Sequence, residues 1–430
     1  MIFDILMSVG VICLIAVFAI RLIAVSGSGN RWKLLNYFSK DNSLGGGYKA
    51  TWKKLLYVFV CALIFRLVAF LCGALIIYML NGEKELSLST VISKYYRWDA
   101  YHYLTIAEKG YAGRIEDGQY ILLVFFPLFP MLVRLFSVFI QNQTAAGLAV
   151  SWLSYAGACT VLTALLSIDY DEETADNSII YLSVFPFAYF FGACMTESTF
   201  LLTVALSMYF IRRHRWFLAG VFGFLASLSR VTGVMLVFAY FAEWMQSGGV
   251  IGMLRGGEYK RFLKYVFKNG LPVLIIPLGM VVYLLMNYAV AGDAFAFLEY
   301  EKSVWHQEMK FFGKTFALIR SYAVMTERMP EMFTIWLPQI AAIILCLAAS
   351  FYGITKHRAM YYGFLVPYFL TNISAAWPIS GCRYMSCAFP LFIFLADFSS
   401  RHKRARAWIL VSFSILFGIY FAAWFKNLIC

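Results

Sequence analysis

Charged residues are scarce in this chain: they make up 14% of its 430 residues, against roughly a quarter in an average soluble domain. Hydrophobic residues make up 62%, and the mean hydropathy is +0.72. This composition excludes a secreted disulfide scaffold, a disordered chain, a coiled coil and an ordinary soluble enzyme. Because one membrane-spanning helix needs about 20 apolar residues, we expect an all-α polytopic membrane protein.

The sequence also lacks the motifs of nucleotide and metal chemistry. It has no Walker loop, no GxGxxG motif after a strand and no HExxH motif. Its nine cysteines show neither CxxC nor Cys/His metal spacing. We therefore expect no ATP-driven transport, no cofactor and no metal centre. The one metal site that the sequence still permits is a single divalent ion held by Asp99 and Glu197.

Apolar runs divide the chain and leave no room for a soluble domain between them. They cover residues 3–25, 55–80, 121–140, 146–168, 178–194, 197–211, 216–229, 231–244, 270–291, 332–353, 359–376, 385–399 and 407–425. These runs predict about 11–13 transmembrane or partly spanning helices. The first run is too long for a signal-peptide core and lacks a basic stretch before it, so we expect a retained helix.

Loop charge predicts the orientation of the chain in the membrane. The net charge is +13, and the basic residues gather in loops 26–54 and 245–268 and in short turns near 212, 356 and 401. Such loops face the cytoplasm, which explains the charge without a nucleic-acid partner. Loops 81–120 and 292–331 are balanced in charge and rich in aromatic residues, and we expect them to be extracytoplasmic.

This orientation requires an odd number of crossings between residues 121 and 211, where four apolar runs lie. One run must therefore fail to span the membrane. The candidates are 121–140, which contains Pro127 and Pro130, and 178–194, which contains Pro186. Broken segments at membrane depth are tolerated where protein covers them or where they line a cavity. We therefore expect a cavity on the outer side.

The segment 97–103 (RWDAYHY) carries the strongest candidate site residues. In a helix Asp99 and His102 share a face, and Gly110 is expected to end that helix. Asp99 then acts as a general base at the membrane surface, beside Arg97 and Trp98. The alternative is a juxtamembrane helix with aromatic anchors, in which Arg97 pairs with Asp99.

Further candidates border other apolar runs, where charged groups are costly and functional by default. Glu197 either lines the outer cavity or has only a structural role, in which its negative charge is stabilised by the positive N-terminal end of a helix that Thr196 caps. Arg230 either pairs structurally, with Glu197 or a backbone carbonyl, or binds a phosphate. Arg383 either extends to the membrane interface as an isolated surface arginine or binds a lipid phosphate. The remaining candidates are Tyr384, which follows Arg383, and Trp305 and His306 in loop 292–331. The alternative role of Trp305 and His306 is that of an anchor at the membrane interface.

Five motifs in order resemble the GPI mannosyltransferase II (PIG-V-like) family, whose bacterial relatives are class C (GT-C) membrane glycosyltransferases. They are RWDAYHY at 97–103, FFPLFP at 125–130, TES at 196–198, SRVTG at 229–233, and RY at 383–384 followed by FPLF at 389–392. The resemblance covers roughly 90–392. Residues 1–54, with a helix and a basic cytoplasmic loop, look like an addition to a catalytic domain at 55–430.

The resemblance implies an inverting hexosyltransferase with its active site outside a bacterial cytoplasmic membrane. The donor would be a sugar, mannose in many relatives, on a polyprenyl phosphate, and the acceptor a glycolipid or glycan. The family's catalytic Asp falls on Asp99. The residue chemistry agrees, since a phosphate leaving group needs cations, which Arg230, Arg383 and His306 supply, and aromatics suit sugar faces. The alternatives are a transporter or flippase of a lipid-linked saccharide and a non-catalytic assembly subunit.

Overall fold

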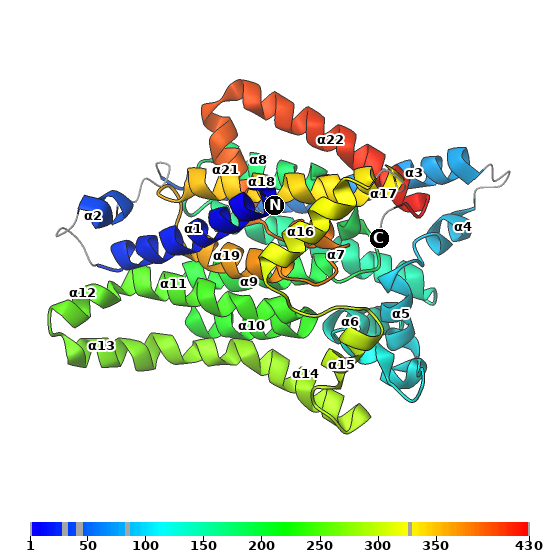
Figure 1. The fold of residues 1–430 in the computed structure, drawn as a ribbon, viewed down its shortest axis with the longest axis horizontal. Coiled ribbons are helices and arrows are strands. Elements are labelled where there is room, and N and C mark those ends of the chain that lie inside the picture. Colours follow the sequence, from blue (N-terminus) through cyan, green and yellow to red (C-terminus); the bar gives the residue numbers. More distant parts are fainter. Residues whose placement is uncertain (1, 28–32, 40–45, 82–86, 326–328, 429–430) are drawn as a thin grey trace.

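The computed structural model describes residues 2–27, 33–39, 46–81, 87–325 and 329–428, and these form an all-α structure (Figure 1). Within these ranges the only β-structure is two isolated bridges, Glu116–Gln119 and Met309–Ala375. The α-helices are α1 (Ile2–Val25), α2 (Lys33–Ser39), α3 (Trp52–Asn81), α4 (Leu88–Ser93), α5 (Asp99–Lys109), α6 (Leu128–Phe136), α7 (Gln143–Leu166), α8 (Glu172–Val184), α9 (Glu197–Arg212), α10 (Trp216–Ser229), α11 (Leu236–Gly248), α12 (Val250–Arg255), α13 (Tyr259–Tyr265), α14 (Ile275–Ala291), α15 (Ala296–Ser303), α16 (Phe312–Ala323), α17 (Met329–Glu331), α18 (Leu337–Gly353), α19 (Ala359–Ile373), α20 (Gly381–Met385), α21 (Pro390–Arg401) and α22 (Lys403–Phe425). Short 3-10 or π turns are η1 (Tyr111–Gly113), η2 (Ile121–Val124), η3 (Ala188–Gly192), η4 (Val231–Met235), η5 (Val266–Gly270), η6 (Leu271–Leu274) and η8 (Met332–Trp336).

Six helical segments of the described chain are long and apolar enough to cross a membrane, so the chain is an integral membrane protein. They are Ile2–Val25, Trp52–Met79, Gln143–Leu166, Tyr259–Ala291, Met329–Gly353 and Lys403–Phe425. Much of their surface is apolar and exposed, as lipid contact requires. The predicted all-α polytopic architecture is confirmed.

Six shorter helices, α8, α9, α10, α11, α19 and α21, complete the bundle. Helix α9 packs against α7 and α10, α11 packs against α19, and α21 packs against α8. Helix α9 has 16 residues and is therefore about 24 Å long, which is less than the ~30 Å of a bilayer's hydrocarbon core. The predicted number of 11–13 transmembrane or partly spanning helices stays a prediction beyond the six long segments of the described chain.

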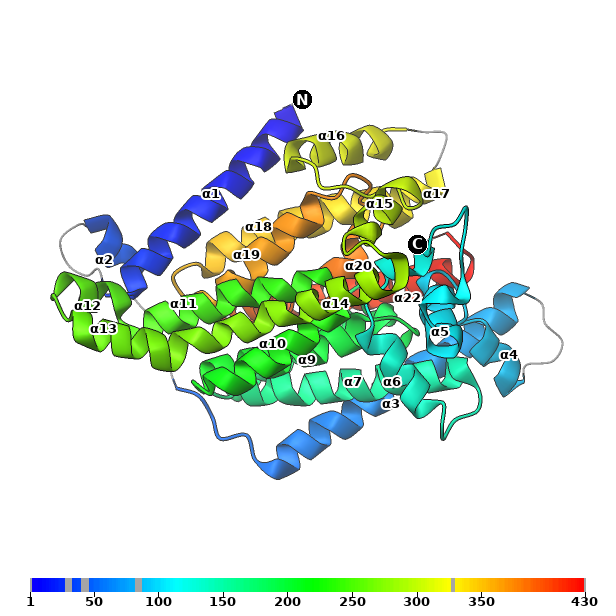
Figure 2. The same cartoon turned by 90° about the horizontal axis from the view of Figure 1, so that it is seen from below.

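Helix α6 is the segment between residues 121 and 211 that does not cross the bundle. It follows Pro127 and has nine residues. Arg134 on α6 donates to the backbone carbonyls of Ala107 and Glu108, which fixes α6 beside α5. Figure 2 shows α5 and α6 together at one end of the bundle. Helices α7, α8 and α9 remain as the candidates for the odd number of crossings that loop charge predicts, and the crossings themselves stay a prediction.

Ion pairs join the basic turns at the opposite end, which we call the basic end. Arg212 Nη2 lies 2.6 Å from Asp169 Oδ1, in the turn between α7 and α8. Arg358 Nη2 lies 2.8 Å from Glu243 Oε1 on α11. Figure 2 places α2, α12 and α13 at this end, and α4, α5, α6 and α15 at the other, which we call the site end. The separation agrees with the predicted cytoplasmic and extracytoplasmic loops.

Helix α1 belongs to the same bundle. It packs against α16 and α19, and Asp4 Oδ1 lies 3.0 Å from Arg320 Nε on α16. The division of the chain at residue 54 stays a prediction, as does the extracytoplasmic position of loops 81–120 and 292–331. In the described parts, these two loops form short helices, α4 and α5 in the first and α15 and α16 in the second.

Candidate active site

Four charged side chains from four separate segments form one continuous chain of ion pairs. Arg383 Nη1 on α20 lies 2.5 Å from Asp99 Oδ2 on α5. The Nε of the same arginine lies 2.6 Å from Glu197 Oε1 on α9. Arg230 Nη1, at the end of α10, lies 2.9 Å from the same glutamate oxygen. We call Asp99, Arg383, Glu197 and Arg230 the ion chain, and all four were singled out from sequence.

The backbone before α5 brings Asp99 to the ion chain. Asp99 is the first residue of α5, and Trp98 precedes it with φ of +52°. A bulky residue rarely adopts positive φ, and such strain persists only where the surroundings impose it. Gly110, with φ of +75°, ends the helix as the sequence predicts.

Glu197 and Arg230 are placed by the ends of two packed helices. Glu197 is the first residue of α9, where the positive end of the helix favours a carboxylate. Arg230 follows α10 in an extended conformation. The turn after it requires Gly233, because a Cβ there would lie 2.3 Å from the Ala226 backbone. Thr196 occupies the N-cap position of α9, but its side chain makes no capping hydrogen bond.

Exposure along the ion chain is lowest in its middle and highest at Asp99. The Glu197 side chain is 0% exposed and that of Arg383 is 4% exposed, whereas the side chains at the two ends are 14% exposed for Arg230 and 32% for Asp99. A buried charge is tolerated only when it is paired, and three members of the chain satisfy this by pairing with one another. Asp99 is the member that a ligand from outside can reach.

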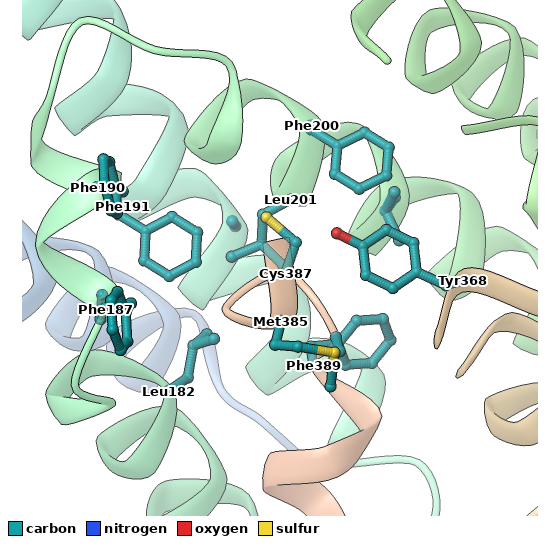
Figure 3. Close-up of a cluster of buried hydrophobic side chains, with 14 of the residues drawn as sticks. Leu182, Phe187, Phe190, Phe191, Phe200, Leu201, Tyr368, Met385, Cys387 and Phe389 are labelled. Atoms are coloured by element: carbon teal, nitrogen blue, oxygen red, sulfur yellow. The ribbon is translucent and has the colours of Figure 1, made fainter. Parts of the chain in front are cut away.

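Aromatic side chains pack against the two arginines. The Arg383 guanidinium lies 5.1 Å from the Phe190 ring centre, and the Arg230 guanidinium lies 4.3 Å from that of Tyr384. Figure 3 shows Phe190 and Phe200 among the apolar residues of this region, with Tyr368 beside Phe200. This apolar packing lowers the local dielectric and strengthens the ion pairs.

Several buried polar atoms beside the ion chain have no hydrogen-bond partner among the described residues. They are Glu197 Oε2, Ser229 Oγ and Thr232 Oγ1. Most buried polar atoms in proteins are paired with protein or water. These three atoms therefore mark a place where water or a polar ligand is expected to complete the hydrogen bonding.

A second group of side chains, beside the ion chain, joins α5 to the loop after α15. The His102 ring stacks on Phe125 with centres 4.7 Å apart, and Trp305 meets both rings edge-on at 5.8 and 5.6 Å. Arg114 Nη1 lies 3.4 Å from His102 Nδ1. The structure thus brings the predicted residues His102 and Trp305 together, one helical turn from Asp99.

Charge neighbours act in opposite directions on the pKa values of Asp99 and His102. Burial raises the pKa of Asp99, but Arg383, with smaller contributions from His102 and Arg230, outweighs burial and holds the pKa below its usual range. Burial lowers the pKa of His102, against the opposing influence of Asp99. At neutral pH Asp99 is therefore ionised and His102 is uncharged.

Glu301 is a carboxyl group beside this site that the sequence analysis missed. It lies on α15, four residues before Trp305. Burial, with a further contribution from the Asp99 charge, raises the pKa of Glu301 to about 7. The signal available in the sequence was that Glu301 is an acid in the same charge-balanced loop as Trp305 and His306. Residue spacing alone, however, does not predict that this loop lies close to Asp99.

The other predicted site residues differ in how they lie relative to the ion chain. Arg97 does not pair with Asp99; it donates to the carbonyls of Trp424 and Lys94 and lies over the Trp424 ring, so that interpretation was wrong. Trp98 is half-exposed at the start of α5, and His306 is exposed. Tyr384 lies beside both arginines, with its ring facing Arg230.

The described residues contain no group of three or more His, Cys, Asp or Glu side chains arranged to hold a metal ion. Asp99 and Glu197, the two acids considered for a divalent ion, are bridged by the Arg383 guanidinium instead. Metal independence itself stays a prediction.

No protein-family model matches the chain, and no curated protein matches it. Among solved structures, it is similar to the archaeal oligosaccharyltransferase AglB from Archaeoglobus fulgidus, which was solved in complex with an inhibitory peptide and a dolichol-phosphate. The TM-score is 0.40 and the sequence identity is 11%. The match covers 88% of this chain and 56% of AglB, so the chain spans about half the length of the structure that it matches.

Proposed function

We propose that this protein is an inverting GT-C glycosyltransferase that moves a sugar from a polyprenyl-phosphate donor to an acceptor hydroxyl on the extracytoplasmic face. One observation carries the proposal: Asp99 is the most exposed member of a chain of ion pairs that also contains two arginines. A base beside cations is what this transfer requires. The resemblance of the sequence motifs to the GPI mannosyltransferase II family supports the donor class and suggests mannose.

Transfer in this site is a single displacement. The acceptor oxygen attacks the anomeric carbon of the sugar, and the bond from that carbon to the phosphate oxygen breaks. The phosphate leaves with the electron pair of that bond, and the proton of the acceptor hydroxyl moves to Asp99. Because the pKa of Asp99 is lowered, the carboxylate is ionised at neutral pH and has an oxygen that can accept a proton.

The arginines stabilise the charge that develops on the leaving phosphate. Arg383 and Arg230 act as electrostatic stabilisers, since fixed cations in a site shielded from water are worth more than in solvent. Glu197 acts as a positioning residue, because its Oε1 accepts hydrogen bonds from both guanidinium groups. Trp305 and Trp98 provide aromatic faces for a sugar.

The proposal is tested by sugar transfer with purified protein in lipid nanodiscs and a panel of polyprenyl-phosphate sugars. Asp99→Asn keeps the size of the side chain and removes the base, so turnover should fall at least 100-fold. Glu108→Gln, on the exposed far end of α5, is the matched control and should retain turnover. Full activity of Asp99→Asn would sink the assignment of the base.

The same experiment separates the alternative functions. A lipid-linked saccharide that crosses the bilayer of a proteoliposome without any glycosidic product would indicate a flippase or transporter. A wild-type protein that neither binds nor turns over any donor would indicate a non-catalytic assembly subunit.

A further inference from the structure

We propose that the donor phosphate replaces Asp99 on Arg383, so that binding of the donor frees the base for the acceptor. This inference rests on the proposed function and adds an order to it, with the donor before the acceptor. The position beside Arg383 Nη1 is occupied by the Asp99 carboxylate in the unliganded protein. In the complex with donor, the phosphate occupies the same position.

The two partners at this position are anchored very differently. Arg383 stays fixed when Asp99 leaves, because its Nε remains bound to Glu197 Oε1 at 2.6 Å and its guanidinium packs over Phe190. Asp99 has one ion-pair partner among the described residues, Arg383, and its side chain is 32% exposed. The carboxylate can therefore turn outward while the arginine keeps its place.

The chemistry of the position suits a phosphate. Arginine binds carboxylate and phosphate oxygens through the same fork of N–H donors, so one anion can take the place of the other. A second cation, Arg230, is tied to the same glutamate oxygen as Arg383. With two acids and two arginines the ion chain is balanced in charge, and an incoming phosphate adds negative charge.

The negative charge of the bound phosphate makes Asp99 a stronger base. Without its arginine, and next to a phosphate, Asp99 has a higher pKa than in the unliganded protein and is a stronger base. The proton that it takes from the acceptor hydroxyl then offsets the added charge. In the absence of donor, Asp99 is held by Arg383 and is not available to activate water or an acceptor.

The test is equilibrium binding of a polyprenyl monophosphate without sugar to the protein in nanodiscs. If Asp99 competes with the phosphate, Asp99→Asn should bind this lipid about tenfold more tightly, which corresponds to about 1.4 kcal/mol, although it loses transfer. Arg383→Ala should bind it at least tenfold more weakly. Glu108→Gln removes one charge from the same helix without touching Arg383 and should bind like the wild type.

Unchanged or weaker binding by Asp99→Asn would overturn the inference, as would normal binding by Arg383→Ala. Either result would leave the proposed function standing if the wild type still transferred sugar. Equal tightening toward phosphatidylglycerol would also overturn it, because the position would then be a general headgroup site. Asp99→Ser serves in the same comparison if the asparagine variant does not fold.

Discussion

Glu197 and Arg383 form a buried ion pair between residues 186 positions apart in sequence, with 2.6 Å between Oε1 and Nε. Neither side chain has substantial access to solvent. The pair therefore costs much to desolvate, and its value lies in what it holds in place. It fixes the guanidinium that contacts Asp99, and through the same oxygen it fixes Arg230.

Loss of Glu197 should therefore cost both stability and activity. In Glu197→Ala two buried arginines lose their shared acceptor, and removal of one partner of a buried pair typically costs about 3–5 kcal/mol. Glu197→Gln keeps one acceptor oxygen and should be destabilised less. Thermal unfolding of the purified variants, with Glu108→Ala as an exposed control, measures the difference. Equal melting temperatures for Glu197→Ala and the wild type would contradict a bridging role.

Glu301 should make stability fall as pH rises through the weakly acidic range. Its pKa is raised in the folded protein to about 7, from an ordinary value of 4.5, so the folded state binds its proton more tightly than the unfolded state does. Its contribution is fully present below about pH 4.5 and is lost between there and about pH 7. Melting curves across this range should show a steeper decline for the wild type than for Glu301→Gln.

The matched control for this measurement is Glu299→Gln, an exposed glutamate on the same helix. It should follow the pH profile of the wild type. Parallel profiles for the wild type and Glu301→Gln would show that Glu301 does not titrate in this range.

The sequence predicted the members of the ion chain and offered the Arg230–Glu197 pair as one alternative, which the structure contains, but it did not predict the pairing of Arg383 with Asp99 and Glu197. Asp99, Glu197, Arg230 and Arg383 were identifiable because charges that border apolar runs are rare and costly. Their pairing depends on tertiary packing between helices far apart in sequence. Arg97 was assigned to Asp99 because the two are close in sequence, but the helix begins at Asp99 and the backbone at Trp98 turns Arg97 toward Trp424.

Local sequence patterns were also insufficient to identify which segment between residues 121 and 211 does not span the membrane. Pro127 and Pro130 marked 121–140 as one of two segments that could fail to span, and the short α6 lies there. The choice between the two segments needed the contacts of Arg134 with the end of α5, which no local pattern contains.

Arg97 should support the fold rather than the donor. Its side chain donates to backbone carbonyls and packs over Trp424, so Arg97→Ala should destabilise the protein by about 1–3 kcal/mol. The KM for the donor should stay within about twofold of the wild type, whereas Arg230→Ala should raise it at least tenfold. Steady-state kinetics on both variants, beside their melting temperatures, make the comparison. A large rise in donor KM for Arg97→Ala with unchanged stability would indicate that Arg97 binds the donor.

The orientation of the bundle should place Asp117 outside and Arg404 inside. Asp117 lies in the exposed turn closed by the Glu116–Gln119 bridge at the site end. Arg404 lies at the basic end, where its neighbour Arg406 pairs with Glu173 at 3.0 Å. A short epitope inserted after Asp117 should be reached by antibody in intact spheroplasts, and one inserted after Arg404 only after permeabilisation. Antibody access to the Arg404 epitope, but not to the Asp117 epitope, in intact spheroplasts would contradict the topology. It would also contradict the choice of donor, because lipid-linked sugars serve transferases that work outside, where nucleotide sugars are absent. Insertion at these exposed positions leaves the ion chain untouched, so retained sugar transfer in both tagged proteins verifies that the native fold is being probed.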